Sequence, residues 1–490
     1  MITTLADLLP LLPLLIATAT TIVAMTAIGI RRNYALTAGI TIAGLLIASL
    51  VAASMISTTN SQVTPLLIVD QYSLFFTVLT CVTAMLIAIF SFPYLANLDD
   101  SKEEYYLLLG IATIGAIVMV SSNHFVSTIL GLETLSMSLY GMVAYPVHSK
   151  LADKFPLEAS VKYLVLSAAA SGILLFGMAL IYAQTGTLEF SSIVNVTKET
   201  PGLGVGFSIV ALIMVFIGIA FKLSLAPFHM WTPDVYEGSP LPATTYLATI
   251  GKSAMFVVLL RLIVTTEALS FDSIILVISL VAIVSILAGN LLALLQDSLK
   301  RILAYSSIAH MGYLLIALVA SYYVQGTISV EAVTFYLFAY MVMSVGAFGV
   351  ISIVSSSEKE FDDIDDYQGL FWRNPWLAAV FTGMLLSLAG IPLTVGFIGK
   401  FYLFFSGVEA GLWILLAILI IGSGVGLYYY LRIVYSMLLS PKDDEGFKSG
   451  GSQYMGSHGV LAFVLALLLV LGVYPTPLVS IIETISLNIL

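Results

Sequence analysis

Charged residues are scarce in this sequence. Only 9% of its 490 residues are charged, whereas 60% are hydrophobic, and average soluble domains carry about 25% charged residues. A composition this apolar excludes an ordinary soluble domain. It predicts an all-α polytopic membrane protein, because a helix satisfies its backbone hydrogen bonds within the bilayer.

Residues that commonly bind metals are also few. Cys81 is the only cysteine, which excludes an intrachain disulfide and a cysteine cluster. No two histidines have metal-ligand spacing, so we expect neither a metal ion nor an iron–sulfur cluster; the histidines are His124, His148, His229, His310 and His458. The net charge of −10 argues against nucleic-acid binding.

The apolar segments predict fourteen transmembrane helices, because a spanning helix needs about 20 mostly apolar residues. They are expected near residues 8–29, 35–56, 72–94, 105–120, 123–144, 159–184, 205–226, 241–264, 272–294, 301–321, 329–354, 375–404, 411–437 and 458–480. The first residues lack the basic segment of a signal peptide, so we expect the first helix to remain uncleaved.

Basic residues in the linkers predict the orientation of the chain, because Lys and Arg collect in short cytoplasmic loops. Eleven of them fall in linkers that follow odd-numbered helices: Arg31, Arg32, Lys102, Lys150, Lys154, Lys300, Arg301, Lys359, Arg373, Lys442 and Lys448. The opposite linkers contain Lys198 alone. This segregation supports an even number of helices, with both termini on the outer side.

A small set of ionisable residues falls inside the predicted helices or at their ends. Burying an ammonium group in hydrocarbon costs roughly 2.5–3.5 kcal/mol even on insertion scales, so such groups need a partner or a water-filled path. Arg261 and Arg432 are expected to be anchors or loop partners, and the Met, Phe and Tyr residues to serve packing and lipid contact. The complete set is Glu133, Lys162, Lys222, Lys252, Arg261, His310, Lys400 and Arg432.

Two of the predicted helices are interrupted. In helix seven, Lys222 precedes a break that ends at Pro227, and proline removes a backbone donor and frees carbonyl groups. In helix twelve, Lys400 follows a break at Gly390-Ile391-Pro392. Interrupted helices at matching places in two halves indicate inverted repeats and an ion path at mid-membrane.

The two repeats define the expected organisation of the chain. Helices 4–8 would form the first repeat and helices 9–13 the second, inverted one. The expected boundaries are 1–104 for three N-terminal helices, 105–264 and 265–437 for the repeats, and 438–490 for a cytoplasmic loop and the last helix.

The buried groups allow alternative hypotheses. The pair Glu133–Lys222 is either a switch that changes as the lysine exchanges its proton, or a static ion pair that fixes packing. Lys252, halfway along helix eight, either carries protons or is bonded to carbonyls, and His310 is either a relay or an interhelical hydrogen bond. Lys162 lies close enough to the cytoplasmic end of helix six to snorkel.

Three segments of the sequence resemble the antiporter-like membrane subunits of respiratory complex I, the bacterial NADH-quinone oxidoreductase. Lys400, and the end of the chain soon after helix fourteen, favour the N type of these subunits over the M and L types. The segments are Gly131–Ser136, Phe221–Pro240 and Gly390–Phe401.

The resemblance implies a fourteen-helix subunit of the bacterial inner membrane, with two inverted five-helix repeats and broken helices seven and twelve. It also implies M-, L- and K-like partner subunits, and no cofactor in this chain, because NADH, FMN, the iron–sulfur clusters and quinone belong to partner subunits. The residues that it assigns to proton translocation are Glu133, Lys162, Lys222, Lys252, His310 and Lys400.

From this resemblance we expect protons to move from the cytoplasm to Lys222 and Lys252, and to leave by Lys400 to the outer face, with His310 bridging the two halves. Two alternatives are a Na⁺/H⁺ antiporter, alone or as a subunit, and a scaffold for neighbouring subunits. Na⁺-dependent transport without NADH-oxidising partners would favour the antiporter, and intact pumping in Lys222→Ala and Lys400→Ala variants would favour the scaffold.

Overall fold

The computed structural model describes residues 5–57, 61–96, 101–145, 156–191, 203–266, 271–324, 327–355, 360–441 and 455–487. Within these ranges the chain is almost entirely helical, and the strands are limited to β1 (Ser61–Gln62) and β2 (Ile68–Val69), which pair antiparallel. Six of the loop lysines that predict the orientation lie outside the described residues: Lys150, Lys154, Lys198, Lys359, Lys442 and Lys448.

The helices of the described residues account for about fourteen membrane crossings, in agreement with the prediction. Twelve helices of the described chain are long and apolar enough to span a membrane, and two broken helices supply the seventh and twelfth crossings. Eleven of the twelve are α1 (Leu12–Ile30), α2 (Tyr34–Met55), α3 (Gln71–Ala96), α4 (Glu103–Val120), α5 (Phe125–Val143), α6 (Pro156–Thr185), α12 (Asp272–Ala293), α13 (Leu299–Tyr323), α14 (Ile328–Val354), α18 (Trp413–Leu438) and α19 (Met455–Val473).

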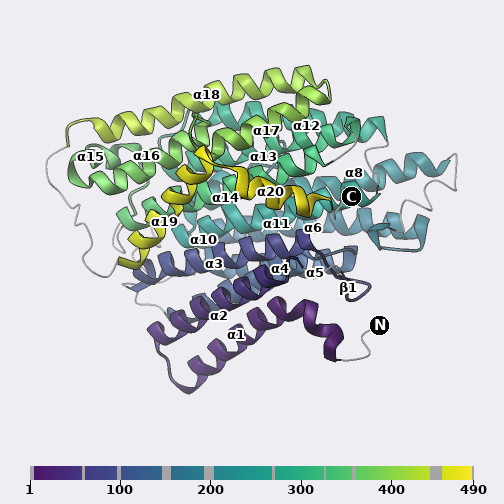
Figure 1. The fold of residues 1–490 in the computed structure, drawn as a ribbon, viewed down its shortest axis with the longest axis horizontal. Coiled ribbons are helices and arrows are strands. Elements are labelled where there is room, and N and C mark those ends of the chain that lie inside the picture. The colour runs from purple at the N-terminus through teal and green to yellow at the C-terminus, as the bar shows by residue number, and fades with distance from the viewer. Residues whose placement is uncertain are drawn as a thin grey trace.

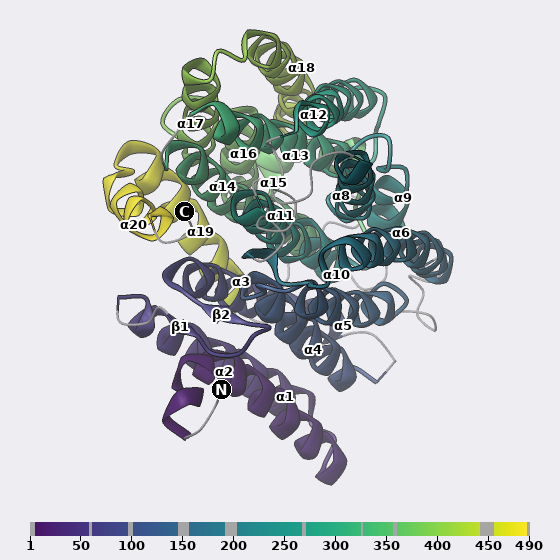
Figure 2. The ribbon, with the colours of Figure 1, turned by 90° about the vertical axis from the view of Figure 1, so that its right-hand side faces the viewer.

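The long helices lie side by side (Figure 1), and a view turned by 90° shows them nearly end-on (Figure 2). The helices α13 and α14 lie at the centre and are buried on almost all sides, whereas α1 lies at one flank and is mostly exposed. A helix that is apolar all round and buried all round needs a specific reason to contain polar side chains. The polar residues of α13 and α14 are therefore candidates for function.

The seventh crossing consists of α8 (Leu203–Lys222) and α9 (Trp231–Gly238), separated by an irregular segment. Ser224 has a positive φ of 61° there. Protein groups satisfy the backbone at this break: Ala226 N donates to Ser285 Oγ at 2.9 Å, and Phe221 O accepts from Trp231 Nε1 at 3.0 Å. Irregular backbone is tolerated at membrane depth when such groups replace the lost hydrogen bonds.

The twelfth crossing consists of α16 (Pro375–Ala389) and α17 (Val395–Glu409). Gly390 ends α16 with φ of 87°, a conformation that favours glycine. A Cβ at this position would lie 2.7 Å from Lys400 Cδ. Glycine is therefore favoured here by the turn, and a side chain at this position would also displace the end of the lysine.

The eighth crossing is continuous but irregular. It runs through α10 (Leu241–Tyr246), a π-helical turn (Leu247–Gly251) and α11 (Lys252–Thr266). Single π turns within helices are frequent at functional sites. Lys252 follows this turn directly.

Further features support two inverted repeats. The two broken crossings are five apart, so they traverse the bundle in opposite directions. The first two helices of each repeat cross closely at glycines: a Cβ on Gly115 of α4 would lie 2.7 Å from Gly131 O of α5, and one on Gly289 of α12 would lie 2.6 Å from Ala309 N of α13.

One sequence-based expectation is wrong in detail, and one expected linker contains short helical turns. The last crossing, expected as one helix over 458–480, is divided into α19 and α20 (Thr476–Ser486), because prolines occupy positions 475 and 477. The linker expected at 355–374 contains a 3₁₀ turn (Ile364–Tyr367) and the short helix α15 (Leu370–Arg373).

Candidate functional site

Lys222 is the last residue of α8, and its ammonium group is buried between α5 and α6. Nζ donates hydrogen bonds to Ser136 Oγ of α5 at 2.8 Å and to Ser167 Oγ of α6 at 2.5 Å. The centroid of the Tyr163 ring lies 5.7 Å from Nζ, within cation–π range. The break in helix seven thus carries a cation whose partners are hydroxyl groups.

Glu133 of α5 does not form the direct ion pair with Lys222 that the sequence suggested. Its Oε1 accepts a hydrogen bond from Ser171 Oγ at 2.7 Å. Ser171 lies four residues after Ser167, the serine that binds Lys222, and residues at this spacing share one helix face. Two serines on one face of α6 therefore lie between the carboxylate and the ammonium, because Ser171 binds Glu133 and Ser167 binds Lys222.

Lys252 is buried next to α13 and α14. Its Nζ donates to Ser307 Oγ at 2.5 Å, and Ser307 Oγ shares a hydrogen bond of 2.6 Å with Tyr340 OH. Nζ also lies 5.6 Å from the centroid of the Tyr236 ring of α9. The partners of this lysine are thus hydroxyl and aromatic groups.

His310 of α13 lies among tyrosines. Its Nδ1 is 2.6 Å from Tyr336 OH, and its Nε2 is 3.3 Å from Tyr430 OH. The Tyr430 hydroxyl is also hydrogen-bonded to Ser306 Oγ, and the Tyr340 ring lies 5.5 Å from the imidazole. Both imidazole nitrogens therefore face hydroxyl groups, which accept and donate protons.

Lys400 of α17 binds the broken end of α16. Nζ donates to Ala389 O, the last carbonyl of α16, at 2.8 Å and to Ser423 Oγ of α18 at 2.7 Å. A cation at a helix C-terminus is favourable, because free carbonyls give that end a partial negative charge. The Tyr313 ring, one turn of α13 beyond His310, lies 5.4 Å from Nζ.

The structure therefore arranges five of the six predicted residues along one polar path, from Glu133 and Lys222 through Lys252 and His310 to Lys400. Sequence reasoning missed most of the side chains between them. The tyrosines, which the sequence assigns to packing and lipid contact, pack in the core here and also place hydroxyl groups or rings along this path. The additional polar residues are Ser136, Tyr163, Ser167, Ser171, Tyr236, Ser307, Tyr313, Tyr336, Tyr340, Ser423 and Tyr430.

Lys162, the sixth predicted residue, lies at the surface end of α6. Its side chain is 44% exposed and pairs with Glu158 at 2.9 Å and with Asp234 at 3.2 Å. The expectation that it reaches the surface is confirmed, and its role in proton transfer stays a prediction.

Arg261 and Arg432 have loop partners, as expected. Arg261 binds Asp70, the residue before α3, with hydrogen bonds of 2.7 and 3.0 Å. Burial raises the pKa of the Asp70 carboxyl, but the charge and hydrogen bonds of Arg261 outweigh burial and hold it below its usual range. Arg432 donates to Gln296 O and lies 3.4 Å from Asp297, both between α12 and α13.

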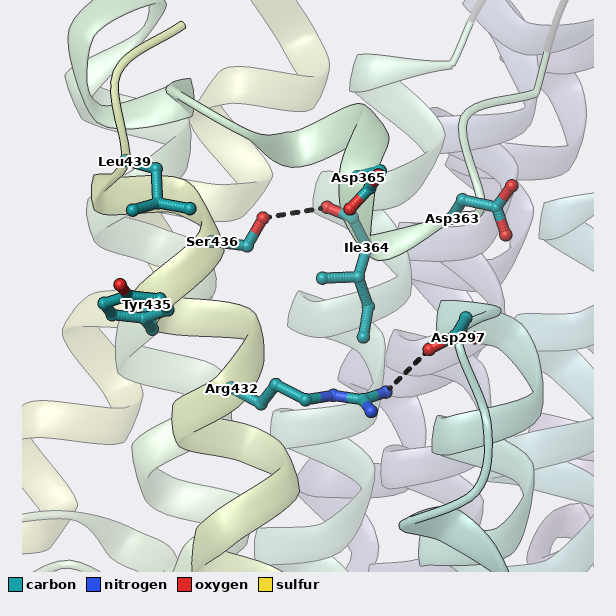
Figure 3. A pocket seen from close by; sticks show the side chains of 8 residues that line it. All are labelled: Asp297, Asp363, Ile364, Asp365, Arg432, Tyr435, Ser436 and Leu439. Atoms are coloured by element: carbon teal, nitrogen blue, oxygen red, sulfur yellow. Dashed lines mark hydrogen bonds and ion pairs between the residues drawn. The ribbon is translucent and has the colours of Figure 1, made fainter. Parts of the chain in front are cut away.

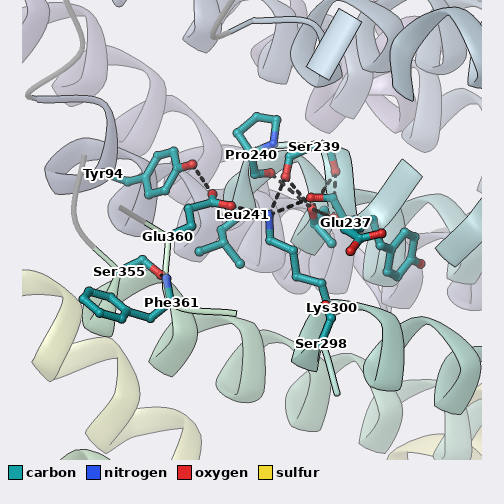
Figure 4. A network of polar contacts seen from close by, with 12 residues as sticks. Tyr94, Glu237, Ser239, Pro240, Leu241, Ser298, Lys300, Ser355, Glu360 and Phe361 are labelled. Atoms are coloured by element: carbon teal, nitrogen blue, oxygen red, sulfur yellow. Dashed lines mark hydrogen bonds and ion pairs between the residues drawn. The ribbon is translucent and has the colours of Figure 1, made fainter. Parts of the chain in front are cut away.

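Lys300 contradicts the prediction that it is a cytoplasmic loop residue. Its side chain is fully buried at the start of α13, where Nζ donates to Glu360 Oε2 at 2.5 Å (Figure 4). Nζ also donates to Glu237 O at 3.3 Å and to Ser239 O at 2.8 Å, at the C-terminal end of α9. Tyr94 OH of α3 donates to the same carboxylate. Lys300, which flanks an apolar run in the sequence, therefore binds the C-terminal end of α9, the second half of helix seven.

A pocket at one end of the bundle lies outside this path (Figure 3). Arg432, which lines the pocket, lies nine residues beyond Ser423 on α18, and Ser423 binds Lys400. The pocket is therefore about 13 Å along the helix from the Lys400 site. Near this pocket, carboxylate oxygens of Asp362, Asp363 and Asp366 lie within 4.8 Å of one another, and each of these aspartates has other interactions within the protein. The lining residues are Asp297, Asp363, Ile364, Asp365, Arg432, Tyr435, Ser436 and Leu439.

Comparison with known proteins agrees with this geometry. Residues 122–426, more than half of the chain, match the family described as NADH:quinone oxidoreductase/Mrp antiporter, TM. A chain of respiratory complex I from Thermus thermophilus is 30% identical, with 96% of this chain and 98% of that one covered and a TM-score of 0.80.

Two further structures share the fold at lower identity. A chain of the archaeal membrane-bound sulfane sulfur reductase is 24% identical, with a TM-score of 0.85 and coverage of 99% and 97% of the two chains. A chain of the Mrp complex from Dietzia sp. is 19% identical, with a TM-score of 0.82 and coverage of 99% and 98%.

Proposed function

The chain belongs to the NADH:quinone oxidoreductase/Mrp antiporter family of transmembrane subunits, and we propose that it translocates protons as the N-type subunit of a bacterial NADH:quinone oxidoreductase. NADH oxidation and quinone reduction take place in partner subunits that hold the redox cofactors. This chain contributes buried proton carriers and has no redox centre of its own.

The observation that carries this proposal is the kind of group that holds the three path lysines. Lys222, Lys252 and Lys400 donate to serine hydroxyls, and Lys400 also to a carbonyl, and no carboxylate of the described residues forms an ion pair with them. A carboxylate would favour the ammonium form strongly. A hydroxyl accepts from an ammonium and donates to an amine, so these sites support both protonation states.

The route follows from the order of these sites. A proton taken up from the cytoplasm occupies Lys222, passes to Lys252, crosses the tyrosine-lined region around His310 and leaves from Lys400 to the outer face. Membrane-arm subunits of the M, L and K types lie beside this chain in the bacterial inner membrane, and both termini lie on the outer side.

The test is the substitution Lys222→Met in the assembled complex, in inverted membrane vesicles. NADH-driven proton uptake and NADH-linked quinone reduction are measured together, and we expect both to fall. Lys102→Met is the matched control, because Lys102 at the start of α4 lies outside the path and donates to Ala96 O. Unchanged uptake and quinone reduction in Lys222→Met would refute the proposal.

A Na⁺/H⁺ antiporter subunit is the second candidate, because the family and the fold are shared with an Mrp complex. The antiporter function predicts that an imposed Na⁺ gradient drives proton movement without NADH, and that Lys222→Met abolishes this movement. A scaffold predicts that Lys222→Met and Lys400→Met leave all transport intact. The three functions thus give different results in the same vesicles.

A further inference from the structure

Tyr236 lies on a short helix that packs against both α6, which binds Lys222, and α13, which binds Lys252. It lies on α9, the second half of helix seven, and its side chain is fully buried. Its ring lies 5.6 Å from Lys252 Nζ. On the same helix, the Trp231 ring stacks on the Tyr163 ring, whose centroid lies 5.7 Å from Lys222 Nζ. The helix that carries Tyr236 therefore contacts the surroundings of both lysines.

The Tyr236 hydroxyl has no hydrogen-bond partner among the described residues. Its neighbour Ser307 is already engaged by Lys252 Nζ and Tyr340 OH. A buried hydroxyl without a partner costs free energy that a phenylalanine of the same shape would avoid. The packing of this site thus gives no reason for the oxygen atom, and a buried unpaired hydroxyl in a polar region is a place where a water molecule binds.

The position of Tyr236 is fixed at both ends of α9. At the first residue of the helix, the Trp231 ring stacks on the Tyr163 ring with centroids 4.8 Å apart. At the other end, Lys300 donates to the carbonyls of Glu237 and Ser239 (Figure 4). A relay group must be held within about 0.5 Å of its productive position, and these contacts hold α9 by its two ends.

We propose that Tyr236 is a proton-relay residue between Lys222 and Lys252, an inference that rests on the proposed proton translocation. The Lys222 ammonium gives one N–H proton, through water, to the phenolic oxygen of Tyr236. In the same step the phenolic O–H proton passes, through a second water molecule, to the Lys252 amine. Lys222 becomes neutral, Lys252 becomes charged, Tyr236 is unchanged, and no oxidant or reductant is consumed.

The test is Tyr236→Phe in the assembled complex, because it removes a single oxygen atom. The readout is proton uptake per NADH oxidised in inverted vesicles, which does not depend on the amount of complex. Lys222→Met in parallel defines the component of uptake that this chain carries. We expect Tyr236→Phe to lower that component at least about tenfold, since positioned proton-transfer groups contribute at least that much.

Tyr105→Phe is the matched control. Tyr105 of α4 is also fully buried, and its hydroxyl is also without a partner among the described residues, but no path lysine lies against its ring. We expect this variant to pump like the wild type. Equal losses in both tyrosine variants would overturn the relay, because loss of any buried hydroxyl would then explain the effect.

The remaining outcomes separate the relay from the proposed function. The Lys222-dependent proton uptake per NADH oxidised could stay within about twofold of the wild type in Tyr236→Phe and be lost in Lys222→Met. The relay would then be overturned, and proton translocation by this chain would stand. If Lys222→Met leaves proton uptake unchanged, proton translocation by this chain is overturned and the relay with it.

Discussion

Replacing Lys300 with methionine should destabilise the chain by about 3–5 kcal/mol, the cost of breaking a buried ion pair by removing one partner. Lys300 is fully buried, and its partner Glu360 is 3% exposed. Methionine fills most of the space of the lysine stem, so the substitution leaves little cavity. The loss of stability therefore measures the cost of leaving the Glu360 carboxylate buried without its cation.

A second contribution comes from the end of α9. The carbonyls of Glu237 and Ser239 both accept from Lys300 Nζ, and each lost hydrogen bond costs about 0.5–1.5 kcal/mol. Tyr94 still donates to Glu360 in the variant, which keeps the cost of the buried carboxylate within the expected range.

The measurement is the free energy of unfolding of the detergent-solubilised chain, from titrations of the wild type, Lys300→Met, Glu360→Met and the double variant. The double variant should recover most of the loss, because apolar residues often replace a buried ion pair at little or no net cost. Lys102→Met, which removes a lysine at the start of α4, should lose no more than about 1 kcal/mol.

Two results would refute this reasoning. A loss below about 1 kcal/mol in Lys300→Met would show that the pair is solvated as a surface pair is. A double variant as unstable as the sum of the two single variants would show that the two side chains do not act as a pair.

Two other substitutions follow from the same contacts. Ser307→Asp places a carboxylate beside Lys252 Nζ, which is 2.5 Å from Ser307 Oγ; it should stabilise the ammonium by about 1.4–4 kcal/mol and stop NADH-driven proton uptake, whereas uptake retained at the wild-type rate would contradict this. Asp70→Asn should lower the thermal unfolding temperature at pH 7, and the unfolding temperature of the variant should fall less in acid than that of the wild type. The reason is that the folded-state pKa of Asp70 is lowered. The stabilisation by the Asp70 carboxylate is therefore present above the usual aspartate pKa near 3.9 and is lost as pH falls through the lower, folded-state pKa. Parallel unfolding curves of wild type and variant from pH 7 to about pH 3 would exclude this role.

The number of crossings could be predicted because the bilayer imposes it. Each crossing must bury about 20 apolar residues, and a lysine or a proline within such a run stands out against that background. The break beside Lys222 and the break before Lys400 were therefore visible in the sequence. The last crossing was misjudged at Pro475 because its apolar run continues through the kink.

The partners of the buried lysines could not be predicted. Serine and tyrosine are common in transmembrane helices, and their role depends on which face of the helix they occupy and on which helix lies opposite. Ser167 and Ser171 matter because α6 turns this face toward Lys222 and Glu133. That arrangement is set by tertiary packing.

Lys300 shows a different limit. A lysine at the start of an apolar run is normally a cytoplasmic anchor, and its carboxylate partner is 60 residues away at Glu360, in a connecting segment. No local pattern joins the two. The rule assumes that linkers and helix ends are exposed to water, and it does not apply to a helix start that neighbouring elements bury.

The cations of the chain divide by what holds them. Those that fix the fold end on carboxylates: Arg261 on Asp70, and Lys300 on Glu360. The path lysines end on hydroxyls and on the last carbonyl of α16. Lys222 and Lys400 lie beside interrupted helices, and Lys252 follows a π turn within a continuous helix.

This division explains why Glu133 is one step removed from Lys222. A carboxylate in direct contact would hold the ammonium as firmly as Glu360 holds Lys300, and proton release would then cost several kcal/mol. Glu133 binds Ser171 and Lys222 binds Ser167, so the two charges are not in contact. The attraction between opposite charges persists beyond contact and decreases with distance. Ser167 and Ser171 of α6 thus keep Glu133 out of contact with Lys222, so that no ion pair holds the proton on the lysine.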